Sequence, residues 1–112
     1  MNHLPLRICG IGRYLPRRIV RNADIEREAG IPADSIAERT GVEFRHRASP
    51  GEGESTSEMG AAAAREALAE AGLDPSEIGL LLFASPIQQQ AIPDTAPLVQ
   101  DELGIGSSGI PS

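Results

Sequence analysis

The chain has 112 residues, a net charge of −6, 40% hydrophobic residues and one cysteine. These values are typical of one globular domain, and no apolar run reaches the ~18 residues that a transmembrane helix needs. The apolar stretch at the N-terminus is too short for a signal peptide, and the single cysteine, Cys9, excludes an internal disulfide and suits a reducing cytoplasm.

The charge is unevenly distributed along the chain. All ten basic residues are arginines; residues 1–47 carry a net charge of +3 and residues 48–112 a net charge of −9. An acidic chain with three aromatic residues lacks the cations and stacking groups that nucleic acids need. We therefore expect no nucleic-acid partner and no membrane association, although the first part could receive an anionic ligand.

Residues 6–12 alternate loosely between apolar and other residues and predict a strand in which Cys9 is buried and inert. Gly10 and Gly12 resemble the start of a dinucleotide-binding loop, but Leu15 stands where the third glycine is needed. We therefore favour close backbone packing at these glycines over phosphate binding. Residues 18–20 predict a short extended segment.

Two short helices are expected next. Asn22 is the candidate N-cap of the first, which runs to about Ala29 and ends at Gly30. Pro32 opens the second, over about residues 33–39, and Gly41 closes it. The alternation in residues 42–47 predicts a strand or hairpin arm at a surface.

The strongest pattern lies in residues 55–84. Ser55 and Glu58 form a capping box, and a helix is predicted from about Thr56 to Ala71, ending at Gly72. Its apolar arc consists mainly of alanine and glycine, so its axis can lie unusually close to the segment that it covers. A short capped turn over residues 74–77 leads to residues 78–84, a continuous apolar run that predicts a strand covered on both faces. This order is typical of α/β architecture.

A loop over residues 85–93 follows, at the end of the predicted strand where parallel α/β sheets bind ligands. Asp94 is expected to cap a last helix over about residues 95–103, ended by Gly104. Residues 104–112 have the composition of a turn that leads into another strand.

No complete catalytic constellation is recognisable from the residues alone. His3 and His46 have no partners at metal-ligand spacing, and no Ser/His/Asp arrangement is evident. We expect no metal and no cofactor. The residues by themselves predict part of a cytoplasmic α/β domain.

Several segments, in order and over nearly the whole chain, resemble the opening of β-ketoacyl-acyl carrier protein synthase III. They are residues 10–16 with Asn22, residues 38–42, 45–47, 57–59, 71–73, 78–80, 92–96 and 98–100. This resemblance implies the N-terminal part of a thiolase-like fold with αβαβα layers, incomplete in this chain. It also implies an acyltransferase that condenses an acyl-CoA starter with malonyl-acyl carrier protein to initiate fatty acid synthesis, working as a homodimer.

The resemblance places the family's nucleophilic cysteine, with its histidine and asparagine, beyond the segment that matches this chain. Cys9 matches none of these residues, so residues 1–112 are expected to end before the nucleophile and to be inactive when isolated. CoA is a substrate in this reaction, and no cofactor is implied.

Two site residues carry over from the resemblance. Arg39 matches the arginine that contacts the CoA nucleotide; Ser35 stands where the family commonly has a tryptophan against the adenine. Ile92 matches the residue that borders the partner's acyl pocket across the dimer interface. Because Ile92 is aliphatic, it leaves room for a longer or branched starter.

Two alternatives stay open at this point. One is a thiolase-fold acyltransferase of secondary metabolism, which the serine at position 35 favours. The other is a non-catalytic module for dimerisation or binding of a partner synthase.

Overall fold

The computed structural model describes residues 3–105. Along the chain lie β1 (Arg18–Arg21), α1 (Asn22–Ala29), α2 (Ala33–Thr40), β2 (Phe44–Arg47), α3 (Thr56–Ala71) and α4 (Thr95–Glu102). Single 3-10 turns form at Pro50–Glu52 and Pro75–Glu77. Among the described residues, no helix is long and apolar enough to cross a membrane.

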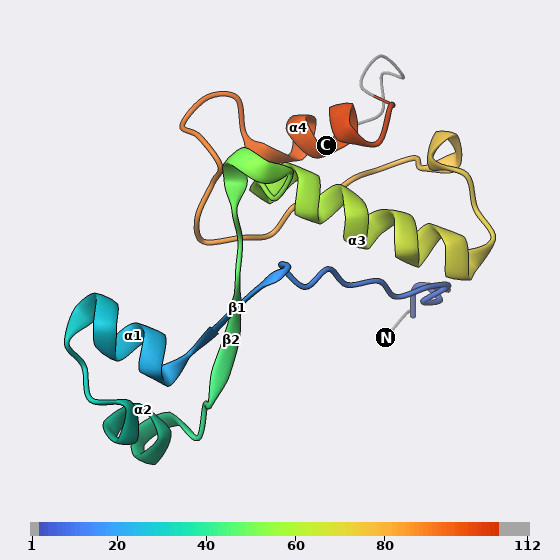
Figure 1. The fold of residues 1–112 in the computed structure, drawn as a ribbon. Coiled ribbons are helices and arrows are strands. Elements are labelled where there is room, and N and C mark those ends of the chain that lie inside the picture. The colour runs from blue at the N-terminus through green and yellow to red at the C-terminus, as the bar shows by residue number, and fades with distance from the viewer. Residues whose placement is uncertain (1–2, 106–112) are drawn as a thin grey trace.

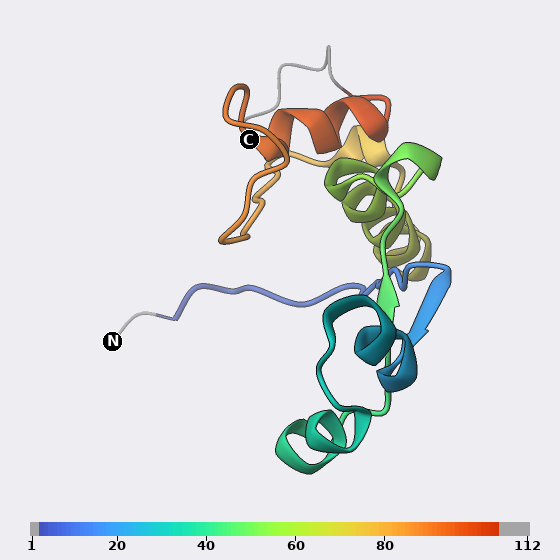
Figure 2. The same ribbon diagram turned by 60° about the vertical axis from the view of Figure 1, so that its left-hand side comes forward.

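The elements form two groups (Figures 1 and 2). In one, α1 and α2 pack together beside an antiparallel ribbon of β1 and β2, in which Arg18 is opposite Arg47. In the other, α4 packs on α3, and Ala61, Val99, Leu103 and Ile105 form a small buried core. The radius of gyration is 17.9 Å, whereas a compact domain of this length has about 13 Å. The described chain is therefore much more open than a self-contained domain.

The central helix is as the sequence predicts. Ser55 Oγ accepts the backbone N–H of Glu58 at 3.3 Å, and the Glu58 carboxylate accepts the N–H of Ser55 at 2.8 Å. These reciprocal bonds satisfy N–H groups that a helix start leaves unpaired. Gly72, with φ of 70°, ends the helix in the left-handed conformation.

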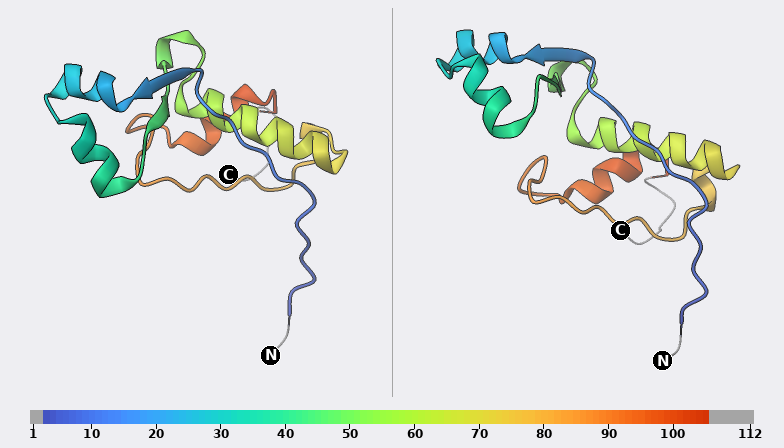
Figure 3. Two further views of the ribbon diagram at one scale, coloured as in Figure 1. Left: turned by 60° about the horizontal axis from the view of Figure 1, so that its bottom comes forward. Right: turned by 90° about the horizontal axis from the view of Figure 1, so that it is seen from below.

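The two glycines near the N-terminus allow the extended chain to lie directly against α3, as the views in Figures 1 and 3 show. A Cβ atom added to Gly10 would be 2.1 Å from the carbonyl oxygen of Ala67. At Gly12 it would be 2.0 Å from that of Ala63. The prediction of close backbone packing is thus confirmed, and the small residues of α3 provide the other half of the contact.

The predicted strand at residues 6–12 does not form among the described residues, where it finds no hydrogen-bonded partner strand. The segment is extended, and Leu6, Ile8 and Ile11 are 84%, 82% and 70% exposed. The prediction that Cys9 is buried is also wrong: its thiol is exposed, because only α3 covers this segment.

The strand predicted at residues 78–84 is likewise absent from the described part of the chain. Ile78, Leu81 and Phe83 pack on the core of α3 and α4, whereas Leu80 and Leu82 are 56% and 82% exposed. Leu81 and Phe83 alternate with Leu80 and Leu82, as opposite faces of an extended segment do, whereas Ile78, directly after the turn at Pro75–Glu77, does not follow this alternation. The expectation that both faces are covered is therefore wrong, because the described residues cover one face only.

Two helix starts differ in detail from the predictions. Arg21, not Asn22, is the N-cap of α1, and the Asp24 carboxylate accepts its N–H at 2.8 Å. Asn22 is instead buried: its amide donates to the carbonyl of Val42 and accepts from Arg45. Asp94 is the N-cap of α4 by position, but its side chain makes no capping bond. The helix ends one residue earlier than predicted, at Glu102. Of the predicted final turn, residues 106–112 lie outside the described residues.

Candidate functional site

The first candidate site lies on α2. Pro32 precedes the helix, and the Glu26 carboxylate accepts the N–H of Ala33, its first residue, at 3.1 Å. Gly41, with φ of 71°, ends the helix one residue after Thr40, whose hydroxyl donates to the carbonyl of Ile36. The predicted boundaries of this helix are confirmed within one residue, so its side chains are held on a well-capped scaffold.

Arg39 lies in the last turn of α2 and is exposed. Ser35 is four residues earlier and half-buried, so that the two positions share one face of the helix. An exposed guanidinium can form paired hydrogen bonds with a phosphate, and a face with a small serine leaves space beside it. This arrangement can receive an anionic ligand but performs no chemistry by itself.

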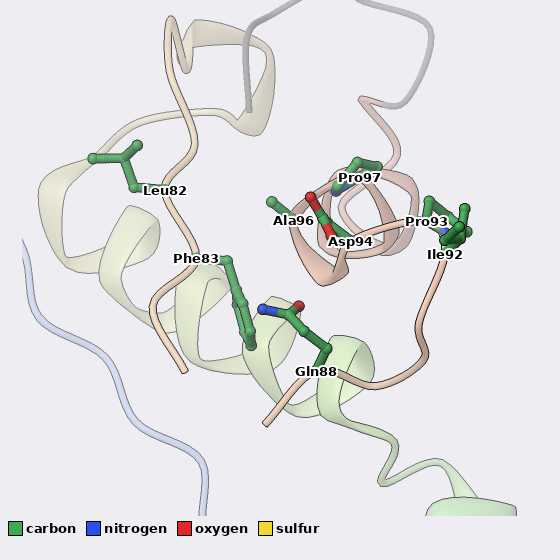
Figure 4. Close-up of a pocket in the computed structure, with 8 residues that line it drawn as sticks. All are labelled: Leu82, Phe83, Gln88, Ile92, Pro93, Asp94, Ala96 and Pro97. Carbon is green, nitrogen blue, oxygen red and sulfur yellow. The ribbon is translucent and has the colours of Figure 1, made fainter. Parts of the chain in front are cut away.

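The second candidate site is a cavity of about 640 Å³ next to the start of α4. Figure 4 shows Leu82 and Phe83 on one side of this cavity and Ile92 and Pro93 on the other, with the first turn of α4 between them. Its lining consists of Leu82, Phe83, Gln88, Ile92, Pro93, Asp94, Ala96 and Pro97. Ile92 is 87% exposed. Six of the eight lining residues are apolar, but the lining exposes about as much polar as apolar surface, so the cavity is a mixed site.

The two candidate sites are not adjacent. Figures 1 and 2 place α2 at the far end of the group formed with β1 and β2, and the loop of residues 85–94 beside α4 in the other group. The structure therefore does not bring Arg39 and Ile92 into one cavity.

A buried carboxylate joins the N-terminal segment to the loop before α3. Glu54 is 1% exposed and accepts the Tyr14 hydroxyl at 2.5 Å and the N–H groups of Arg17 and Ser49 at 2.9 and 3.2 Å. The hydrogen bond from Tyr14 is the main reason that the pKa of Glu54 lies below its ordinary value. The same bond raises the pKa of Tyr14.

These bonds leave Glu54 fully engaged as a structural acceptor, and no pattern in the sequence distinguishes it from the surrounding acidic residues. Elsewhere among residues 3–105, no group of three His, Cys, Asp or Glu side chains is placed to hold a metal ion. His46 Nδ1 lies 2.6 Å from the carbonyl oxygen of Pro16 and is used structurally.

No family model matches the chain. Curated relatives do match it: β-ketoacyl-acyl carrier protein synthase III of Rhizorhabdus wittichii is 44% identical over 99 residues, which are 88% of this chain and 30% of the relative. The enzyme of the same name from Brucella canis is 46% identical over 96 residues, 86% of this chain and 29% of the relative. The chain thus spans about 30% of the length of these relatives.

Solved structures agree with the sequence matches. The 3-oxoacyl-acyl carrier protein synthase III of Aquifex aeolicus superposes with a TM-score of 0.81 at 37% identity, over 92% of this chain and 32% of that one. The priming β-ketosynthase of the R1128 polyketide pathway gives a TM-score of 0.69 at 31% identity, over 95% of this chain and 30% of that one. The predicted resemblance is confirmed: the chain is similar, over most of its length, to the N-terminal portion of β-ketoacyl-acyl carrier protein synthase III and has the corresponding part of the thiolase-like fold.

Proposed function

We propose that this chain is the N-terminal portion of an acyltransferase that condenses an acyl-CoA starter with malonyl-acyl carrier protein, the step that initiates fatty acid synthesis. The observation that carries this proposal is the similarity to synthase III enzymes, at 44–46% identity over more than four-fifths of the chain. We place the nucleophilic cysteine and its histidine and asparagine partners outside residues 1–112, since Cys9 matches none of them.

In this proposal Arg39 contacts the phosphates of the CoA nucleotide. Its exposure and its place on a capped helix support that role. Ile92 borders the partner's acyl pocket across a homodimer interface, and its exposure on the loop before α4 supports this second role.

The location follows from the same reasoning. We propose that the protein works in the cytoplasm, where an exposed free thiol such as that of Cys9 stays reduced. No cofactor is needed, because acyl-CoA is a substrate.

Two observations favour a second candidate function in secondary metabolism. The priming β-ketosynthase of a polyketide pathway shares 31% of its aligned residues with this chain, and Ser35 departs from the tryptophan common in synthase III. In that case the acyl group would be transferred to an acceptor other than the malonyl-acyl carrier protein of fatty acid synthesis.

The experiment that tests the proposal incubates the purified protein, at the full length in which it occurs, with a series of acyl-CoA starters and malonyl-acyl carrier protein. Mass spectrometry then follows the carrier protein. We expect a β-ketoacyl-carrier protein product that depends on both substrates. Acyl transfer to other acceptors only would favour the second candidate, and no transfer from any acyl-CoA would refute both.

A further inference from the structure

Three consecutive glutamines, Gln88, Gln89 and Gln90, lie in the loop between residue 84 and α4, and each makes a side-chain hydrogen bond. Gln88 Oε1 accepts both the hydroxyl of Thr95 at 2.7 Å and its backbone N–H at 3.1 Å. Thr95 is the first residue of α4 and is completely buried. Because the Asp94 side chain makes no capping bond, Gln88 satisfies this helix start in its place.

Gln89 joins the same loop to the other helix. Its Oε1 accepts the N–H of Ser57, the second residue of α3, at 2.7 Å, across 32 positions of sequence. Its own backbone N–H donates to Thr95 Oγ1 at 3.0 Å. Ser57 is 3% exposed, so water has little access to replace the glutamine as acceptor. The loop is thus fastened to the first turns of both α3 and α4.

The fastened loop carries Ile92. Gln90 Nε2 donates to the carbonyl oxygen of Ile92 at 2.9 Å, which ties the residue back to the glutamines. Gln88 itself lines the cavity, so the side chain that caps α4 also forms part of the wall that Ile92 completes. Figure 4 shows Gln88 and Ile92 at different parts of that wall. A displacement of Gln88 or Gln90 would therefore move the wall and Ile92 with it.

We propose that Gln88, Gln89 and Gln90 are positioning residues that fix the loop carrying Ile92 and thereby help to determine which acyl chains the protein accepts. The proposal rests on the proposed function, because it takes Ile92 to border the acyl pocket of the partner protomer. Selectivity at such a wall is sensitive to small changes, since one methylene in an apolar pocket alters kcat/KM by roughly 10- to 200-fold.

The test compares Gln89→Leu with Gln89→Glu in the purified protein at its full natural length. Leucine removes the acceptor at similar size, whereas glutamate keeps an acceptor and places a negative charge at the start of α3, where it is favourable. Two quantities are measured: the ratio of kcat/KM for acetyl-CoA and octanoyl-CoA, and the amide hydrogen exchange rates of Ser57 and residues 85–94.

For Gln89→Leu we expect the kcat/KM ratio to change about tenfold or more, with exchange at Ser57 faster by about tenfold, the effect of losing one hydrogen bond. Gln89→Glu should keep both quantities within about twofold of the wild type. If Gln89→Leu does not fold, Gln90→Leu at an exposed position, which frees the Ile92 carbonyl, should change the kcat/KM ratio while exchange at Ser57 stays within about twofold of the wild type, because Gln89 still accepts the Ser57 N–H.

An unchanged kcat/KM ratio in a leucine variant that is active overturns the positioning role and leaves the proposed function intact. An equal loss of activity toward both acyl-CoA substrates overturns it as well, because that result shows a general structural effect. A wild-type protein that transfers no acyl group refutes the proposed function itself, and the inference with it.

Discussion

Replacing Gly12 by alanine tests the close approach between the N-terminal segment and α3. The new Cβ atom would lie 2.0 Å from the carbonyl oxygen of Ala63 and 2.6 Å from the backbone nitrogen of Ala67. Both are backbone atoms of a regular helix, so neither can turn aside as a flexible side chain does. Contacts of real Cβ atoms are at least 3.0 Å, so the segment must move away from α3 by at least about 1 Å.

Such a displacement separates a packed interface rather than a single contact. Overpacking in well-packed regions costs about 1–3 kcal/mol, and the rigid neighbours here place Gly12→Ala at the upper end, about 3 kcal/mol. Gly60→Ala is the matched control, because its Cβ would meet Val99 Cγ2 at an ordinary 3.5 Å. Gly60 lies inside α3, where alanine stabilises a helix by about 1 kcal/mol relative to glycine.

The assay is urea unfolding of the two variants and the wild type, in the protein at its natural length. We expect the unfolding midpoint to fall for Gly12→Ala and to rise or stay constant for Gly60→Ala. Equal midpoints for Gly12→Ala and the wild type would show that the segment does not lie against α3 as described.

Four further predictions concern the site residues and the buried carboxylate. Arg39→Ala should weaken acyl-CoA binding by roughly 10- to 100-fold, as loss of a charged hydrogen bond to phosphate does. Ser35→Trp should tighten acyl-CoA binding by roughly tenfold through adenine stacking. Calorimetry with CoA measures both affinities, and unchanged affinities would remove α2 from the CoA site. Ile92→Phe should lower kcat/KM for octanoyl-CoA relative to acetyl-CoA by roughly tenfold, because the ring fills part of the acyl pocket that Ile92 borders, whereas an unaltered ratio would count against that place. Glu54, whose pKa is lowered from 4.5 chiefly by the Tyr14 hydrogen bond, contributes stability that is present above its unfolded pKa and is lost as the pH falls through its folded value. Glu54→Gln should therefore be less stable at neutral pH but lose less stability on acidification, and parallel pH profiles of the unfolding midpoint would refute this.

Local signals in the sequence predicted the helices well. The capping box at Ser55 and Glu58, and the glycines at positions 30, 41 and 72, specify helix ends through neighbouring residues only. The alanine and glycine arc of α3 also predicted the close approach that Gly10 and Gly12 then make. These features need no information from distant parts of the chain.

The strands depended on partners, and there the predictions failed. Residues 6–12 and 78–84 have strand-like composition, but a strand forms only when a neighbour supplies hydrogen bonds, and none does among residues 3–105. The burial of Cys9 failed for the same reason. The hydrogen bonds made by Glu54, Gln88 and Gln89 link residues up to 40 positions apart. The sequence did not predict them, because glutamate and glutamine are ordinary surface residues.

If the chain is the N-terminal portion of a synthase III-like enzyme, as we propose, residues 78–84, which have no strand partner among residues 3–105, pair with neighbouring strands in the protein at its full natural length. Amide hydrogen exchange of Leu80, Leu81 and Leu82 in the purified protein tests it directly. In a protein that catalyses acyl-CoA condensation, we predict that these three amides are protected as strongly as those in the middle of α3, because they pair with neighbouring strands. Exchange at the rate of unstructured peptides in such an active protein would contradict the claim.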